Sequence, residues 1–333
     1  MGLCRWASVW LTGDIRGCGG TGRCGLVRIL VLGAGVIGSV YAGKLLEAGH
    51  DVVLLARGSR LADLQSHGLL LEDAESGSRT AQLVASISEP APDDRFDLVL
   101  VPVRSEQLAS TLAVLTAMTD GSDVLFFGNT GNRAAELSAA LGERALFGFP
   151  AAGGTRDGPT IKYVQIRQQK TMLGEPDGTI TSRIRRLQHV LDGAGFPTLI
   201  SADIHAWLLG HAAFVVPIAF ALYRVGIDAP RLAADPAIMR LMVLATREAF
   251  TALHAAGNDE IPANLRALYR LPTVLVIAYW RRVFNGPRGE LWFGAHSRAA
   301  PEEMHALARD LQEAMRHTGR PTPNLERLLT APA

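Results

Sequence analysis

The sequence has 333 residues, of which 48% are hydrophobic, enough for two domains with their own cores. Its 33 Lys and Arg residues are nearly balanced by 32 Asp and Glu, which leaves a formal charge of +1. This balance argues against nucleic acid or an anionic membrane as the partner, so we expect a small-molecule ligand.

The first 27 residues differ from the rest of the chain. They are rich in glycine and lack helical or strand periodicity, so residues 1–27 are predicted to be a disordered extension, or an N-terminus assigned too early. All three cysteines, Cys4, Cys18 and Cys24, lie here without the paired spacing of a zinc knuckle, so no metal is predicted. A cysteine-free body, with no signal peptide and no membrane span expected, predicts a cytoplasmic protein.

From Arg28 to about residue 148, short apolar runs alternate with segments of helical length. The runs are RILVLG, DVVLLA, FDLVLVPV and DVLFFG. This alternation predicts a parallel sheet with crossover helices. TIKYVQIRQ and KTMLGE are expected to be strands joined by a turn, which extend the sheet in antiparallel fashion. We therefore predict an α/β domain of the Rossmann type over residues 28–180.

After Thr181 the spacing of apolar residues becomes helical. The segments are separated by breakers such as Gly195-Phe196-Pro197 and Asn285-Gly286-Pro287. They predict an all-α domain over residues 181–330 that contributes to the substrate site; its apolar stretch LPTVLVIAYW is either the face of a homodimer or part of the core. The predicted helical segments cover residues 181–194, 203–225, 235–256, 262–284 and 301–316.

The stretch RILVLGAGVIGSVYA places Gly33, Gly35 and Gly38 in a G-x-G-x-x-G pattern between a strand and a helix. In this context the first glycine makes a tight turn, the second leaves room for a pyrophosphate, and the third lets helix and strand approach closely. The pattern predicts a dinucleotide site. Its predicted cofactor-binding residues are Gly33, Ala34, Gly35, Val36, Ile37 and Gly38.

The end of the second strand indicates which dinucleotide binds. An NAD site usually has Asp or Glu there, but DVVLLARGSR ends in Arg57, with Arg60 close behind. Guanidinium groups can hold a 2′-phosphate through charge-assisted hydrogen bonds, whereas a solvated loop is the alternative interpretation. Asp51 lies at the start of the strand, too far away to bind the ribose. We predict NADP as the cofactor.

Taken in order, the glycine turn, Arg57, FDLVLVPVRSEQL, FFGNTGN and GTRDGPTIKY resemble the ketopantoate reductase family over roughly residues 28–320. The resemblance implies a Rossmann domain joined to an all-α domain, with NADPH and substrate in the cleft between them. It also implies reduction of the ketone of 2-dehydropantoate to a hydroxyl.

The resemblance also implies roles for single residues. Arg104 stands where the family usually has a lysine near the cofactor, and Gln107 follows it as in the family. Asn129 matches an asparagine that contacts the cofactor. Glu290, in GPRGELWFGAH, falls where the family has an acidic residue that helps hold the substrate.

The segment DIHAWLLGHAAFVVPIA departs from the family. The family's general acid is a lysine close after the tryptophan, but counting from Trp207 puts Leu209 there and counting back from Pro217 puts Leu208 there. The asparagines that bind substrate are replaced by apolar residues. His211 is the predicted replacement for the proton donor, since histidine does acid and base work near neutral pH. A packing role is the alternative for His211, and more so for His205.

The sequence thus predicts an NADPH-dependent reductase of a small ketone or 2-oxo acid, similar to ketopantoate reductase but with an altered and less polar substrate site. Its predicted catalytic residues are His211 and Glu290. The alternative is an NADP(H)-binding sensor or partner-binding protein with little or no catalysis.

Overall fold

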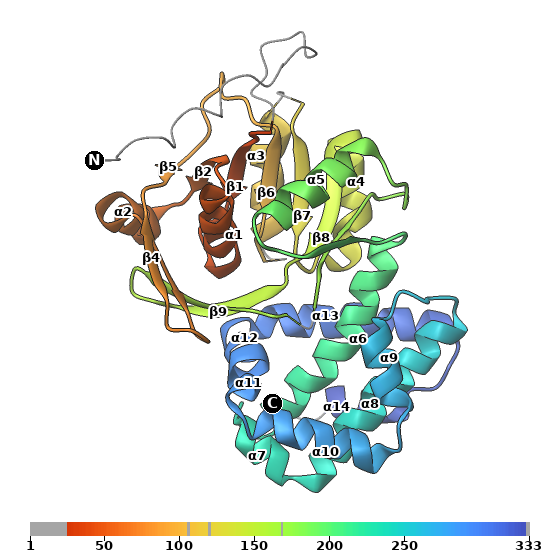
Figure 1. Ribbon diagram of the computed structural model, residues 1–333. Coiled ribbons are helices and arrows are strands. Elements are labelled where there is room, and N and C mark those ends of the chain that lie inside the picture. Colours follow the sequence, from red (N-terminus) through yellow and green to blue (C-terminus); the bar gives the residue numbers. More distant parts are fainter. Residues whose placement is uncertain (1–24, 105–106, 119–120, 168, 331–333) are drawn as a thin grey trace, which may run out of the picture.

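The computed structural model describes residues 25–104, 107–118, 121–167 and 169–330. The three cysteines and nearly all of the predicted extension lie outside these ranges. The chain forms a sheet domain and a helical domain, which Figure 1 shows one above the other, with α6 (Ile204–Tyr223) leading from the first into the second.

The sheet domain is built on eight strands in the order β12-β11-β8-β7-β6-β1-β2-β5. All neighbouring pairs are parallel except β11 with β8, which is antiparallel. The central strands are apolar throughout because helices cover both faces of the sheet. This confirms the predicted Rossmann-type sheet. The strands are β1 (Arg28–Leu32), β2 (Asp51–Leu55), β5 (Ala85–Ile87), β6 (Leu98–Val101), β7 (Asp123–Phe127), β8 (Ala145–Phe149), β11 (Thr171–Gly174) and β12 (Thr198–Ile200).

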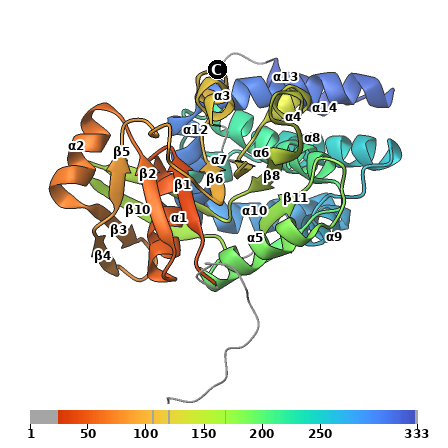
Figure 2. The same cartoon turned by 90° about the horizontal axis from the view of Figure 1, so that it is seen from above.

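Two layers of helices enclose this sheet, as Figure 2 shows from above. On one face, α1 (Val36–Glu47) and α5 (Ser182–Gly193) bury apolar side chains against the strands. On the other face, α3 (Leu108–Ala117) and α4 (Ala134–Leu141) do the same. α2 (Gly58–His67) follows β2 at the edge of the sheet.

A second, four-stranded sheet packs against α1, with the order β4-β3-β10-β9. The predicted strand TIKYVQ is β10, which pairs with β9 and β3, whereas TMLG is β11 of the main sheet. The expectation that both strands extend the main sheet in antiparallel fashion is confirmed for β11, which pairs with β8, and is wrong for β10. The reason is that β10 buries Ile161 and Tyr163 toward α1 instead of extending the main sheet. The strands are β3 (Leu69–Asp73), β4 (Arg79–Gln82), β9 (Ala152–Asp157) and β10 (Thr160–Gln165).

The change from sheet to helices comes later than residue 181. α5 packs on the main sheet, and β12 pairs with β11 at its edge. The helical domain accordingly begins with α6, and the stretch from Thr181 to Ile200 belongs to the sheet domain. Helical spacing placed α5 correctly, but spacing alone does not say which layer a helix joins.

α6 is the central helix of the second domain. It is apolar and long enough to cross a membrane by length and composition, contrary to the expectation that no such stretch exists, but 72% of its most apolar window is buried within the fold. Around it pack the helices α7 (Ala229–Ala234), α8 (Pro236–Ala255), α9 (Ala263–Arg270), α10 (Thr273–Phe284), α13 (Pro301–Thr318) and α14 (Pro323–Leu329), with the short helical turns α11 (Pro287–Gly289), η4 (Glu290–Gly294) and α12 (Ala295–Ala299).

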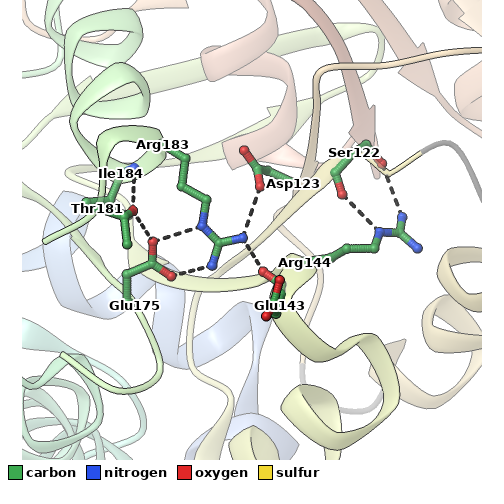
Figure 3. Close-up of polar contacts among 8 residues, drawn as sticks. All are labelled: Ser122, Asp123, Glu143, Arg144, Glu175, Thr181, Arg183 and Ile184. Atoms are coloured by element: carbon green, nitrogen blue, oxygen red, sulfur yellow. Dashed lines mark hydrogen bonds and ion pairs between the residues drawn. The ribbon is translucent and has the colours of Figure 1, made fainter. Parts of the chain in front are cut away.

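A buried ion-pair network ties the far edge of the main sheet together (Figure 3). Arg183, on the first turn of α5, donates through Nε to Glu175 Oε1 at 2.9 Å and through a second nitrogen to Asp123 Oδ1 at 3.1 Å. It also donates to the carbonyl oxygen of Glu143, and Thr181 donates to Glu175. The network joins β7, β11 and α5.

Candidate active site

A cavity of about 1560 Å³ opens between the two domains. One side is formed by the loops at the carboxyl ends of β1, β2, β6, β7 and β8, the other by α6, the 259–266 segment and the 291–304 segment. Open α/β sheets bind ligands at these strand ends. Because pockets for one small molecule are usually smaller than this, the cavity has room for a dinucleotide and a substrate together.

The glycine turn has the geometry that a dinucleotide requires. Gly33 has a φ of +127°, and a Cβ on Gly38 would lie 2.0 Å from the carbonyl oxygen of Gly33, so neither position admits a side chain without a shift. A Cβ on Gly35 would meet nothing within 4 Å. The cavity lining includes residues 33–37, whereas Gly38 packs behind the turn.

The N-terminus of α1 also has the features of a dinucleotide site. Its N-cap, Gly35, offers no side-chain hydrogen bond, and the first turn carries no acidic residue. The free backbone N–H groups and the positive end of the helix dipole therefore suit a phosphate group. The turn fits the pyrophosphate of a dinucleotide.

The two arginines after β2 have different roles. Arg57 is exposed, precedes α2 and lines the cavity, where it can meet a 2′-phosphate. Arg60 is buried, and it donates to Ala34 O at 3.1 Å, to Ser39 Oγ at 3.0 Å and to Pro159 O at 2.9 Å. Arg60 also lines the cavity, but three of its donors hold the glycine turn and Pro159, so it has fewer N–H groups left for a phosphate than Arg57.

Arg104 and Asn129 lie at the ends of the next two strands, β6 and β7, and both line the cavity. Arg104 is exposed, and its backbone N–H donates to Gln107 Oε1 at 3.3 Å. Asn129 is buried and donates through Nδ2 to Glu303 Oε1 at 2.8 Å. This hydrogen bond joins the sheet domain to α13.

Three carboxylates line the cavity, those of Asp259, Glu260 and Glu303, and Glu290 is not among them. Glu290 is outside the lining and forms an ion pair with Arg298 at 2.7 Å, with half of its side chain exposed. Glu303 is only 7% exposed, lines the cavity and lies in the first turn of α13, where the helix dipole favours a negative charge. No local pattern in the sequence points to Glu303, because only the fold brings the start of α13 to Asn129.

α6 turns one stripe of side chains toward the cavity. Neither Leu208 nor Leu209 lines it, so both positions considered for the family's lysine face elsewhere. His211 does line it, but burial, helped by the nearby charge of His296, lowers the pKa of His211 to about 3. A histidine with this pKa is neutral at pH 7, which argues against His211 as the group that supplies the proton. The cavity-facing stripe is Trp207, His211, Phe214, Val215, Ile218 and Ala219.

The other histidine of α6 is a packing residue, as its alternative interpretation held. His205 does not line the cavity and meets the edge of Phe147 at 4.8 Å between ring centroids. His296 is not among the residues predicted from the sequence; it is exposed, lines the cavity and lies close enough to influence His211. Within the described residues, no group of three or more His, Cys, Asp or Glu side chains is placed to hold a metal ion.

His211 should give the protein a characteristic sensitivity to acid. Its folded-state pKa of about 3 lies below the ordinary value of 6.5, so its contribution to stability is complete above pH 6.5 and is lost as the pH falls toward 3. At pH 5 the loss is about 2 kcal/mol. Urea unfolding of wild type and His211→Phe at several pH values should therefore give curves that diverge from pH 6.5 down to pH 4. Parallel curves would contradict the assignment.

The chain is similar to known reductases. A family model described as "Ketopantoate reductase PanE/ApbA" matches residues 29–178. The 2-dehydropantoate 2-reductase of Pyrococcus abyssi is 26% identical over 189 residues, which cover 56% of this chain and 60% of the relative. The chain therefore matches about three-fifths of the length of the curated relatives.

Solved structures resemble the whole fold. The 2-dehydropantoate 2-reductase from Geobacter metallireducens has a TM-score of 0.76 at 19% identity, with 91% of this chain and 98% of that chain covered. D-mandelate dehydrogenase with NADH and anilino(oxo)acetate has a TM-score of 0.69 at 16% identity, with 91% and 96% covered. At these identities the likeness concerns the fold. Together with the glycine turn and the helical second domain, the match over residues 29–178 is consistent with a divergent member of the ketopantoate reductase PanE/ApbA family.

Proposed function

We propose that the protein is an NADPH-dependent reductase of a small ketone or 2-oxo acid. The observation that carries the proposal is a single cavity with the glycine turn and Arg57 at one end and the Asn129–Glu303 pair at the other. The glycine turn and Arg57 suit the phosphates of a dinucleotide, and the Asn129–Glu303 pair suits the end of the cofactor that reacts with the substrate. The relatives that carry the name 2-dehydropantoate 2-reductase support the same class of reaction.

The chain's own residues are proposed to donate the proton and to position the reacting groups. When bound, the nicotinamide supplies the hydride that the carbonyl carbon accepts. The carbonyl oxygen then needs a proton, and His296 is the exposed cavity residue next to His211 that can provide it. His211, uncharged, offers a ring N–H as a hydrogen-bond donor, and Glu303 fixes the amide of Asn129 beside the cofactor.

Turnover by the purified protein tests this proposal. NADPH oxidation should depend on an added 2-oxo acid, in a panel that includes ketopantoate. His296→Gln should slow turnover roughly tenfold or more, because the proton donor is lost. His205→Gln, outside the cavity, should leave the rate unchanged. Saturable NADPH binding without turnover on any member of the panel would favour a non-catalytic NADP(H)-binding protein instead.

Arg57 is expected to choose between the two dinucleotides. Arg57→Gln should weaken NADPH binding by roughly 10- to 100-fold and leave NADH binding unchanged, since only NADPH has a 2′-phosphate to lose a charge-assisted hydrogen bond. Isothermal titration with both cofactors measures the effect. Arg60→Gln provides the contrast: it disturbs the glycine turn and should weaken both. Equal losses for Arg57→Gln with the two cofactors would refute the role.

A further inference from the structure

We propose that the substrate end of the cavity binds an aryl-substituted 2-oxo acid, with the ligand's ring against a wall of aromatic side chains. The inference rests on the proposed function and names its substrate class. We call six of the rings that line the cavity, contributed by both domains, the aromatic wall; the rings of Phe127, Tyr279, Trp280 and His296 also line the cavity but are not counted in it. Its members are Phe149, Trp207, His211, Phe214, Trp292 and Phe293.

The rings of the aromatic wall are in contact from one domain to the other. Phe149, at the end of β8, lies 4.2 Å from His211 between ring centroids, and His211 stacks on Trp207 at 5.3 Å. Phe214, on the next turn of α6, meets Phe293 edge to face at 6.0 Å. The wall is therefore a continuous aromatic surface, and a ligand ring can add to it at the same spacings.

Three rings of the wall are not completely covered by the protein. Phe149, Trp292 and Phe293 are half-buried, although each lies in the cavity lining. Phe284, whose ring is 6.0 Å from that of Phe293, is by contrast fully buried and outside the lining. The packing core thus ends at Phe284, and the partly exposed rings present apolar area that a ligand can bury.

The chemistry of the wall favours an aryl group over a hydroxylated aliphatic one. The polar atoms of its members are the ring nitrogens of His211, Trp207 and Trp292, so a ligand hydroxyl placed against the phenylalanine rings would lose its water without gaining partners. Cations for a carboxylate line other parts of the cavity: Arg104, Arg266, which also pairs with Asp259, and Arg298, which also pairs with Glu290. An acid with a flat apolar ring at its other end satisfies both regions.

The test compares matched 2-oxo acids with NADPH. Phenylglyoxylate and phenylpyruvate are the aryl probes, and 4-methyl-2-oxopentanoate and ketopantoate are the aliphatic probes. For at least one aryl acid we expect a kcat/KM roughly 10- to 100-fold above both aliphatic acids, because a buried ring contributes more apolar area and ring contacts. Equal or better turnover of an aliphatic acid would overturn the inference and leave the proposed reductase standing.

Two variants locate the ring. Phe293→Leu and, from the other domain, Phe149→Leu keep an apolar side chain but remove an aromatic partner, and each should lower the aryl-to-aliphatic ratio by about 3- to 10-fold. Phe284→Leu is the matched control, since it disturbs the same packing without reaching the cavity, and its ratio should stay at the wild-type value. An unchanged ratio in both cavity variants would contradict the assignment.

Binding separates a failure of the inference from a failure of the proposed function. If no acid supports NADPH oxidation, the reductase proposal fails, and titration of the protein–NADPH complex with the same four acids decides the inference. Tighter binding of an aryl acid than of both aliphatic acids, weakened in Phe293→Leu, would support the aryl site. Binding without that preference, or no binding, would overturn it.

Discussion

Replacing Gly35 with valine should weaken NADPH binding by roughly 100-fold or more and leave the fold intact. The backbone of Gly35 has φ −71° and ψ −168°, an extended conformation that valine adopts without strain, and a Cβ there meets nothing within 4 Å. The added methyl groups would occupy the space in front of the α1 N-terminus, where the pyrophosphate needs close backbone contact. Titration calorimetry measures the affinity, and urea unfolding checks the fold.

Whereas Gly35→Val should affect NADPH binding, Gly38→Ala, at the last glycine of the motif, should mainly affect stability. Its Cβ would collide with the carbonyl oxygen of Gly33 at 2.0 Å, so the turn and α1 must move apart, at a cost of about 3 kcal/mol in unfolding free energy. One glycine of the motif thus governs binding and the other governs packing. NADPH binding by Gly35→Val at wild-type affinity would show that the cofactor does not lie over this turn.

Arg183→Leu should lower the free energy of unfolding by about 3 kcal/mol, because it leaves the buried carboxylate of Glu175 without its cation. Glu175 is 2% exposed, and its other side-chain partner is the hydroxyl of Thr181. We use the lower end of the usual range for buried pairs since the Arg183 side chain is 21% exposed. Equilibrium urea denaturation measures the loss.

Two controls accompany this prediction. The double variant Arg183→Leu with Glu175→Gln should recover part of the stability, because no uncompensated charge remains. NADPH affinity should not change in either variant, since the network of Figure 3 lies outside the cavity lining. A single variant as stable as the wild type would mean that Glu175 is held in its place by other groups.

The parts of the site that could be predicted are those whose residues lie close together in the sequence. The glycine turn lies within six consecutive residues, so its conformation could be predicted from their spacing, and the structure places its backbone in the cavity lining. Arg57 and Arg60 look equivalent in the sequence, yet one is exposed at the cavity and the other is bonded to Ala34 and Pro159. Their difference arises from the second sheet, whose position the sequence did not reveal.

The substrate end depended on contacts distant in sequence, and prediction failed there. Glu303 meets Asn129 across 174 positions, whereas Glu290 was favoured because it lay near a loosely matching stretch. His211 was placed correctly in the cavity, but its pKa depends on the rings and the histidine that surround it in the folded protein. The same holds for α5 and β12, whose helical and apolar patterns did not indicate that they complete the sheet domain.

Arg60 makes the β9–β10 hairpin a support for the cofactor loop. Its guanidinium group connects the carbonyl of Ala34 with that of Pro159, at the tip of the hairpin. A reporter or affinity tag inserted at this tip would pull on the glycine turn, even though the tip is a surface turn. The segment around Leu83, which is 95% exposed between β4 and β5, has no such connection to Arg60 and is the better place to insert one.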